Sequence, residues 1–283
     1  MPRQAMNKSV ENNELLKNQA IDVFSQSSAL TETVKMPSRG KISGIPEEIV
    51  IKAIQRKDKK KMLMSETDDV LLSLLQSSIV SPQNFNVYDL LPFESMYLLY
   101  RLRVLTYGGD YTFKESCPHC KHVNEINMNL SDIPIIEVPD NFKLIFDMPP
   151  LPISGMQLKW KLLTEGELAK LNKKAKEIRD NTGNKAVDID LLWEARIVSI
   201  NGNSKLAPIE IEQILDEMND YDSEYFMEYY NKYAGNYGLQ TQISYICDKC
   251  GNKVESNMPS IYTFFRPTIK IPTIKWWTYR CII

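Results

Sequence analysis

The sequence lacks several features that would assign it at once to a large functional class. It has no run of about eighteen apolar residues, so no segment is expected to span a membrane. Its eleven glycines are scattered, and no Gly-x-x-x-x-Gly-Lys run is present to bind phosphate. Histidine occurs only at His119 and His122, so a Ser-His-Asp triad would need one of these two neighbours. We therefore expect no enzyme, although a carboxylate site built from distant positions would leave no trace in these patterns.

An excess of charge of one sign is also missing. The chain has 34 basic and 36 acidic residues and a formal net charge of −2, which excludes the uniformly basic surface of a protein that coats nucleic acid. Residues 1–62 nevertheless hold twelve basic and seven acidic residues, so this part is about +5 and the remainder about −7. With 43% hydrophobic residues, the 283-residue chain can bury one or two cores.

Four of the five cysteines form two Cys-x-x-Cys pairs, each preceded and followed by residues that alternate like a strand. Such a pair at the tip of a hairpin, which we call a knuckle, presents two thiolates on one side, and two facing knuckles supply the four sulfurs that zinc prefers. The knuckles are separated by 126 residues, but loop-closure entropy rises only logarithmically with length. We predict one structural Zn²⁺ held by Cys117, Cys120, Cys247 and Cys250.

Other interpretations of these residues stay open. The sequence Cys117-Pro118-His119-Cys120 is similar to the active site of the periplasmic thiol oxidases of the thioredoxin fold, where the first cysteine begins a helix. The strand-like residues after it, the second cysteine pair and the absence of an export signal favour zinc over thiol-disulfide exchange. His119 or His122 could replace a cysteine as ligand, and cadmium or iron could replace zinc. Cys281 is expected to be a small apolar residue in a packed tail.

Changes in composition divide the chain into six parts and predict an α+β fold, a split zinc ribbon with a helical insertion. Residues 1–40 are rich in Asn, Ser, Gln and Thr and contain no secretory signal, so we expect a flexible arm of a cytosolic chain that orders on a partner. The other expected parts are a mostly helical region at 41–108, a first zinc knuckle at 109–132, a β and helical insertion at 133–238, a second zinc knuckle at 239–267 and an aromatic C-terminal tail at 268–283.

Apolar periodicity and capping residues locate the expected helices and strands. Helices are predicted after the capping run 65–69, from Pro92 to the glycines at 108–109, from Thr164 to about Asp180, over 188–200 and over 207–230, the last divided near Asp220. Short strands are expected among the prolines of 133–163, and further strands at 111–113, 240–245, 253–258 and 261–265. The basic cluster 56–61 is interpreted as a solvated turn or helix end, and the eight acids of 207–230 as a solvent face that could meet a basic partner.

In this order, the features resemble the baseplate hub subunit family of T-even-like contractile-tailed bacteriophages. The resemblance covers about residues 40–267 and rests on the helix around 91–103, the two knuckles, the run 191–202 and the ending Phe264-Phe265-Arg266-Pro267. It implies a structural or assembly role in the hub of a phage tail baseplate, assembled in the host cytoplasm, with other hub or tail proteins as partners and no small-molecule substrate.

Partner contacts are expected at Trp276, Trp277 and Tyr279, because interface anchors favour Trp and Tyr, although these side chains could also fold back onto their own domain. The alternative function is a zinc ribbon that binds nucleic acid. The residues around the knuckles balance four lysines with four acids, which gives little electrostatic attraction for phosphate.

Overall fold

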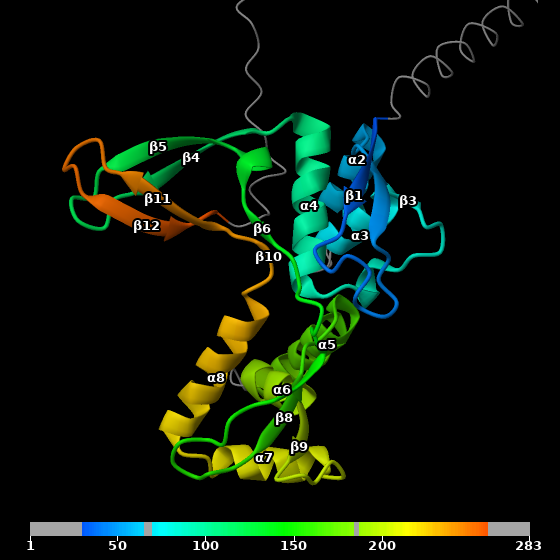
Figure 1. Cartoon of the computed structure of the whole chain (residues 1–283), viewed down its shortest axis with the longest axis vertical. Coiled ribbons are helices and arrows are strands. Elements are labelled where there is room, and N and C mark those ends of the chain that lie inside the picture. The colour runs from blue at the N-terminus through cyan, green and yellow to red at the C-terminus, as the bar shows by residue number, and fades with distance from the viewer. Residues whose placement is uncertain (1–29, 65–69, 184–186, 260–283) are drawn as a thin grey trace, which may run out of the picture.

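The computed structural model describes residues 30–64, 70–183 and 187–259. Helix α4 (Pro92–Tyr107) stands at the centre of the upper part, with a small sheet on one side and a pair of β-hairpins that extend away on the other (Figure 1). A second small sheet and further helices form the lower part. The fold is therefore the mixed α+β type that the sequence predicts.

Helix α4 forms the middle of the main core. Pro92 occupies its first turn and Gly108, with a φ of 83°, follows its last residue, so both predicted ends are confirmed. Leu98 and Leu102 are fully buried. The helix contacts helix α3 (Val70–Ser78), the 3₁₀ helix η2 (Leu130–Asp132) and strand β10 (Gly238–Leu239), which pairs with β6 (Ile135–Ile136).

The N-terminal sheet corrects one prediction. Its antiparallel strands lie in the order β1 (Thr31–Lys35), β2 (Glu48–Lys52) and β3 (Ile79–Ser81). Val34 pairs with Ile49 and both are buried, so the prediction of a flexible arm over 1–40 is wrong for residues 30–40. Polar residues surround Val34, and it is the pairing with the apolar strand β2 that makes this segment a strand. Residues 1–29 lie outside the described residues.

The region 41–108, predicted to be mostly helical, contains the strands β2 and β3 besides its helices. The basic cluster 56–61 forms the first part of helix α2 (Arg56–Met64), which agrees with the helix end and not with the turn that the sequence left open. Asp58 in the first turn accepts the backbone N–H of Gln55 at 3.1 Å and stabilises the start of this helix. Helix α3 follows the predicted capping run, and η1 (Val87–Asp89) leads into α4.

The lower sheet has the antiparallel order β7 (Ile145–Asp147), β8 (Leu158–Lys161) and β9 (Ile197–Ile200). Trp160 on β8 is fully buried, with ring centroids 4.9 Å from Phe146 and 5.1 Å from Tyr230. These aromatic contacts join the proline-rich segment to the helix that carries Tyr230.

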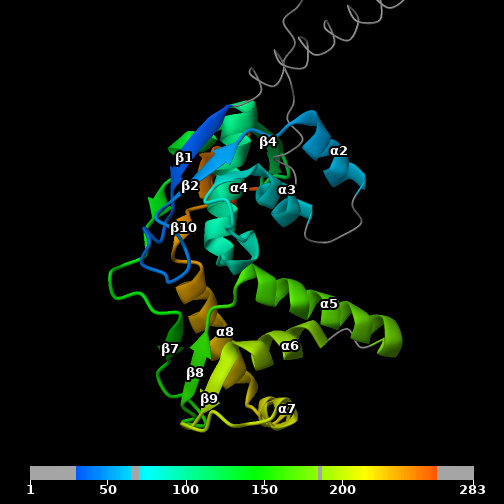
Figure 2. The same cartoon turned by 90° about the vertical axis from the view of Figure 1, so that its right-hand side faces the viewer.

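The predicted helix over 188–200 is correct only in its first part. Helix α6 (Val187–Arg196) ends where β9 begins, because Ile197 and Ile200 pair with β8 and bury their side chains there. The helix predicted from Thr164 is confirmed as α5 (Glu165–Thr182), with a complete capping box between Thr164 and Glu167. Figure 2 shows α5 and α6 projecting together from the lower sheet.

The acidic segment 207–230 forms two helices, as the sequence suggested. These are α7 (Pro208–Asp216) and α8 (Asp220–Ala234), and the break lies at 217–219, where the Asn219 side chain accepts the N–H of Tyr221. Asp222 of α8 is buried and accepts the backbone N–H groups of Ile153 and Ser154 at 2.8 and 2.9 Å. Burial acts to raise the pKa of Asp222, but these hydrogen bonds lower it below its usual value.

The strand predicted at 261–265 and the aromatic tail 268–283 lie outside the described residues. Among the helices that the structure describes, none has the length and apolar character needed to cross a membrane.

Candidate metal centre

Two β-hairpins bring the four paired cysteines together. The first hairpin consists of β4 (Asp110–Ser116) and β5 (Val123–Asn129), and the second of β11 (Gln242–Ile246) and β12 (Lys253–Asn257). Both pairs of cysteines lie in the turns between the strands, and the hairpins lie side by side on the arm that extends from α4 (Figure 1). The prediction of two knuckles at hairpin turns is therefore confirmed.

The two turns have the same backbone hydrogen bonds. In each turn the N–H of the first cysteine donates to the carbonyl five residues later, and that cysteine's carbonyl accepts the N–H four residues later. The pairs are Cys117 N to His122 O (2.8 Å) with Lys121 N to Cys117 O (2.9 Å), and Cys247 N to Asn252 O (3.0 Å) with Gly251 N to Cys247 O (2.9 Å).

A left-handed backbone at one position allows this turn. Lys121 has a φ of 59° and Gly251 a φ of 70°, and these residues occupy equivalent places after the second cysteine of each pair. Glycine adopts this conformation without steric cost, whereas lysine there is strained. The first turn therefore tolerates a strained residue, as expected where surrounding contacts determine the geometry.

The four sulfurs form one compact group. The Sγ atoms of Cys117 and Cys250 are 3.7 Å apart, those of Cys120 and Cys247 are 3.6 Å apart, and all four lie within 4.8 Å of one another. These separations exceed a disulfide bond of about 2.05 Å, and the four thiols are free. A tetrahedron with metal–sulfur bonds of about 2.3 Å has edges of about 3.8 Å, so the group has the size of a four-thiolate metal site.

The thiols differ in how readily they lose a proton. The backbone N–H of Cys250, which donates to the sulfur of Cys247, lowers the pKa of Cys247 to about 6 although burial opposes this change. At Cys120 a backbone N–H from His122 also acts to lower the pKa, but burial and the neighbouring sulfurs raise it to about 11. One thiolate thus forms readily, and its negative charge opposes the ionisation of a second thiol beside it. Four thiolates therefore need a bound cation to compensate their charge.

A buried asparagine joins the two hairpins beside the sulfurs. Asn124 of β5 is only 3% exposed. Its Oδ1 accepts the backbone N–H of Asp248 at 3.0 Å, and its Nδ2 donates to the carbonyl of His122 at 3.3 Å. Asn124 was not among the residues predicted from the sequence, although strand alternation places it on the same face as the half-buried Ile126 and Met128.

A second polar contact joins the two hairpins. The hydroxyl of Ser256 on β12 donates to Oε1 of Glu115 on β4 at 3.1 Å. Apolar contact at the turns is small, since the buried cluster there consists of Cys117, Cys247 and Val254, with the partly buried Cys120 and Tyr245 packed against it. The hairpins therefore depend on the sulfur group and a few hydrogen bonds to stay together.

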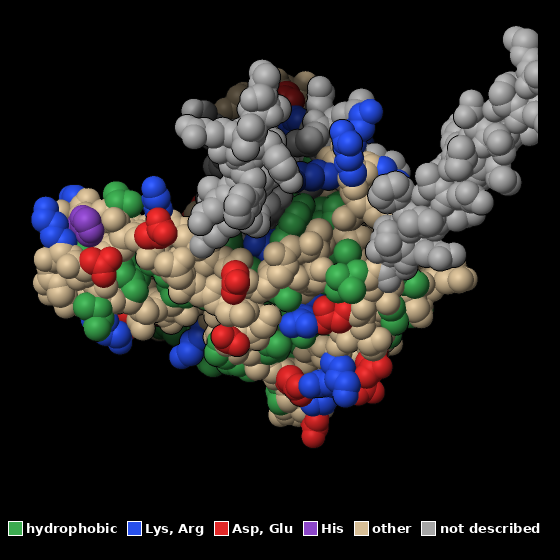
Figure 3. All heavy atoms as spheres, turned by 90° about the horizontal axis from the view of Figure 1, so that it is seen from above, with side chains coloured by type: hydrophobic (Ala, Val, Ile, Leu, Met, Phe, Trp, Pro, Cys, Tyr) green, Lys and Arg blue, Asp and Glu red, His purple; other side chains and the backbone are tan. Residues whose placement is uncertain are grey.

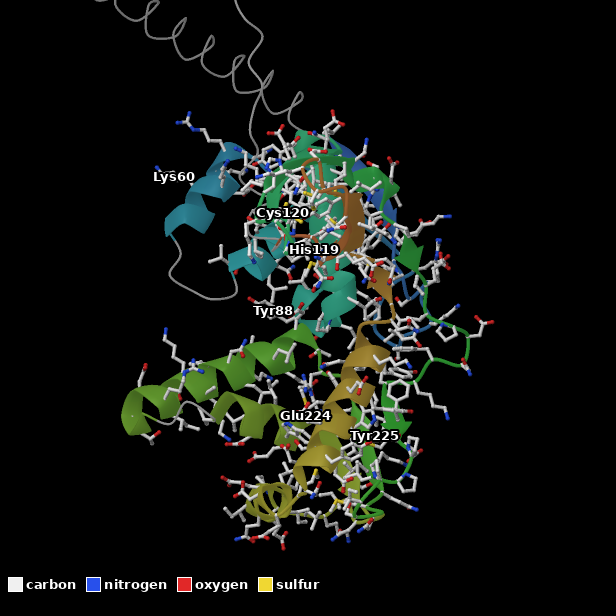
Figure 4. All side chains as sticks on the ribbon, turned by 90° about the vertical axis from the view of Figure 1, so that its left-hand side faces the viewer. Lys60, Tyr88, His119, Cys120, Glu224 and Tyr225 are labelled. Carbon is white, nitrogen blue, oxygen red and sulfur yellow. The ribbon has the colours of Figure 1, made fainter. Side chains whose placement is uncertain are left out.

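The histidines stay outside the sulfur group. His119 is exposed next to Cys120 at the turn of the first hairpin (Figure 4), and His122 is half-buried and contributes its carbonyl. Among the described residues, the potential metal ligands that come together here are the four cysteines alone. The sequence Cys117-Pro118-His119-Cys120 lies between two strands and begins no helix, so it lacks the helix N-terminus that lowers the pKa of the reactive cysteine in thiol oxidases.

The remaining predicted residues cannot be placed. Trp276, Trp277 and Tyr279, the expected partner contacts, and Cys281 all lie outside the described residues.

Together, the mixed fold and the two facing cysteine pairs define an α+β protein with a zinc-ribbon-like element that could bind a metal ion. The family model described as "T4 bacteriophage base plate protein" matches residues 29–266. The chain belongs to this family, and the predicted resemblance to phage baseplate proteins is confirmed. The family indicates a structural role in the baseplate of a phage tail and contacts with other tail proteins. No curated protein and no solved structure matches the chain.

Proposed function

We propose that this protein is a structural or assembly component of the hub region of a contractile phage tail baseplate, and that it acts through protein–protein contacts on a zinc-stabilised scaffold. The family match over residues 29–266 is the observation that carries the proposal. It extends across both hairpins and the segments between them, so the role belongs to the whole described fold.

In this proposal Cys117, Cys120, Cys247 and Cys250 bind one Zn²⁺. Zinc with four thiolates has no open position for water or substrate, which makes the ion structural and not catalytic. The backbone N–H of Cys250 that donates to Cys247 stabilises a thiolate there, and the sulfur spacing matches a tetrahedron. Zinc would then fix the relative position of two hairpins that the chain separates by 126 residues.

The surface of the hairpins favours protein partners over nucleic acid. Basic and acidic side chains are interspersed on the hairpin arm, which is seen from above in Figure 3, and Lys253 pairs with Glu255 at 3.2 Å. A surface of this kind provides little electrostatic attraction for a phosphate backbone. Helix α8 also carries the exposed Glu224 and the half-buried Tyr225 (Figure 4), and the tail residues Trp276, Trp277 and Tyr279 are further candidates for partner contacts.

Complementation in a phage that encodes this chain tests the proposal. A phage in which the chain is not expressed should form heads but no complete baseplates, as seen by electron microscopy of infected-cell lysates. Supplying the wild-type chain or the Cys281→Ser variant should restore tails, whereas Cys247→Ser should not. Normal tails without the chain would refute a baseplate role, and normal tails with Cys247→Ser would refute the need for the zinc scaffold.

A further inference from the structure

A groove of about 880 Å³ lies between the start of α5 and the adjoining ends of α3, η1 and α4. Its apolar floor includes Leu71 and Leu72 of α3 and Met96 and Leu99 of α4. Met96 is 37% exposed although it belongs to the central helix. The described fold therefore leaves an apolar surface open beside its main core.

The closed end of the groove is fixed by contacts at the start of α5. The hydroxyl of Ser95 donates to Glu165 Oε1, and the N–H of Glu165 donates to the carbonyl of Leu90 at 2.8 Å. Gly166 lies so close to η1 that a Cβ atom there would be 3.0 Å from the carbonyl oxygen of Tyr88, which lies beside the start of α5 (Figure 4). Helix α5 thus forms a fixed wall that extends opposite α3 (Figure 2).

This wall carries a row of lysines. Lys170, Lys173 and Lys176 line the groove, are exposed and make no ion pair with any residue that the structure describes. Of the three carboxylates that line the groove, Glu165 binds Ser95 and Glu167 binds Lys161 at 2.6 Å. The third, the exposed Asp89 at the end of η1, accepts a hydrogen bond from Asn86 Nδ2 at 3.4 Å. The mouth of the groove therefore combines an apolar floor with a basic wall, which fits an apolar segment that carries acids along one side.

We infer that residues 10–24 of this same chain dock in the groove as an amphipathic helix that covers its apolar floor. In that segment Leu16, Ala20, Val23 and Phe24 recur at helical spacing. The three acids of the segment are Glu11, Glu14 and Asp22. Glu14 and Asp22 follow Glu11 by about one and about three helical turns, so the three acids share one side of such a helix and match the three lysines in number and sign.

The point where this segment joins the fold allows the contact. Leu30 precedes β1, and its carbonyl accepts the N–H of Ala53 at 2.8 Å. Ile54, next to Ala53, donates its N–H to the hydroxyl of Thr106 near the end of α4. The groove residue Leu99 lies seven residues, about 11 Å, before Thr106 along this helix, and the residues between Phe24 and Leu30 can span about 20 Å when extended. The C-terminal residues 260–283 fit less well, because they hold four basic residues and no acid and the lysine wall would repel them.

Hydrogen exchange and zero-length cross-linking of the full chain test this inference. Amides of residues 10–24 should exchange at least about tenfold more slowly than in the free peptide 8–26. Carbodiimide should link Glu11, Glu14 or Asp22 to a lysine of the wall. Both signals should disappear in K170E/K173E/K176E, and combining this variant with E11K/E14K/D22K should restore them.

A matched variant, K143E/K205E/K232E, changes the net charge equally at exposed lysines away from the groove and should keep both signals. Exchange of residues 10–24 at the free-peptide rate in the wild-type chain would overturn the inference. It would also be overturned if the cross-links joined isotope-labelled to unlabelled copies, which would identify a second copy as the occupant. The inference would also be overturned if K170E/K173E/K176E regained both signals when combined with E66K/D68K/D69K and not when combined with E11K/E14K/D22K. That result would show that the three lysines of α5 contact residues 65–69.

Discussion

Replacing Asn124 by alanine should loosen the metal centre without touching a sulfur. Asn124 is 3% exposed and makes two hydrogen bonds, to the N–H of Asp248 at 3.0 Å and to the carbonyl of His122 at 3.3 Å. Its removal leaves a backbone donor near the hairpin interface without its partner, which costs about 1–3 kcal/mol. Among the described residues the local cluster is small, with Cys117, Cys247 and Val254 buried and Cys120 and Tyr245 partly buried against them, so little apolar contact compensates this loss. About 2 kcal/mol corresponds to a roughly 30-fold increase in the open form of the hairpin pair.

Zinc transfer to an excess of chromophoric chelator measures that opening directly. Asn124→Ala should release zinc roughly 10-fold to 30-fold faster than the wild type at the same pH. Asn127→Ala is the matched control, because Asn127 is an exposed residue of the same strand whose side chain accepts the Thr112 hydroxyl at 2.6 Å within one hairpin. The control should stay within about twofold of the wild type. Equal release rates for Asn124→Ala and Asn127→Ala would refute the claim that Asn124 joins the hairpins.

Three further predictions concern the cross-link and two buried carboxyl groups. Cys247→Ser should lose one zinc per chain in native mass spectrometry. It should also lose up to about 5 kcal/mol of unfolding free energy, because the metal no longer closes a loop of 126 residues in the unfolded chain. Cys281→Ser should lose neither, and equal zinc in the two variants would contradict the site. Burial raises the pKa of Glu94 from 4.5 to about 7, so the native state retains a proton that the unfolded state releases, and stability should fall by about 3 kcal/mol as the pH rises from 4.5 to 7. Glu94→Gln should remove this part of the pH dependence in urea unfolding, and an unchanged slope would show that the group does not carry it. Asp222→Ala should cost about 2–3 kcal/mol in the same assay, because two backbone N–H groups lose their acceptor, and exposed Asp220→Ala should cost much less; similar losses would contradict the role of the buried carboxylate.

The features that the sequence predicted well are those encoded by local chemistry. Pro92 and Gly108 mark the ends of α4, and Thr164 with Glu167 forms the capping box of α5, because each signal acts on the backbone within one helical turn. The cysteine pairs were also predictable, although they are far apart along the chain. Their spacing has few chemical explanations in a reduced protein, and two copies of one pattern point to a shared site.

The features that the sequence did not reveal depend on contacts made over long distances in the chain. The polar run 31–35 becomes β1 because β2 offers an apolar partner, and 197–200 becomes β9 because β8 lies beside it. Asn124 could not be predicted, because the identity of a single asparagine does not indicate whether its side chain is buried. The groove beside α5 likewise arises only when α3, α4 and α5 meet.

X-ray absorption at the zinc edge of the purified full chain tests the four-thiolate centre most directly. The predicted result is one zinc per chain with four sulfurs at about 2.3 Å and no nitrogen or oxygen ligand. A shell that includes nitrogen from His119 or His122, or a chain that contains no zinc while its paired cysteines are oxidised to disulfides, would contradict the zinc-stabilised scaffold.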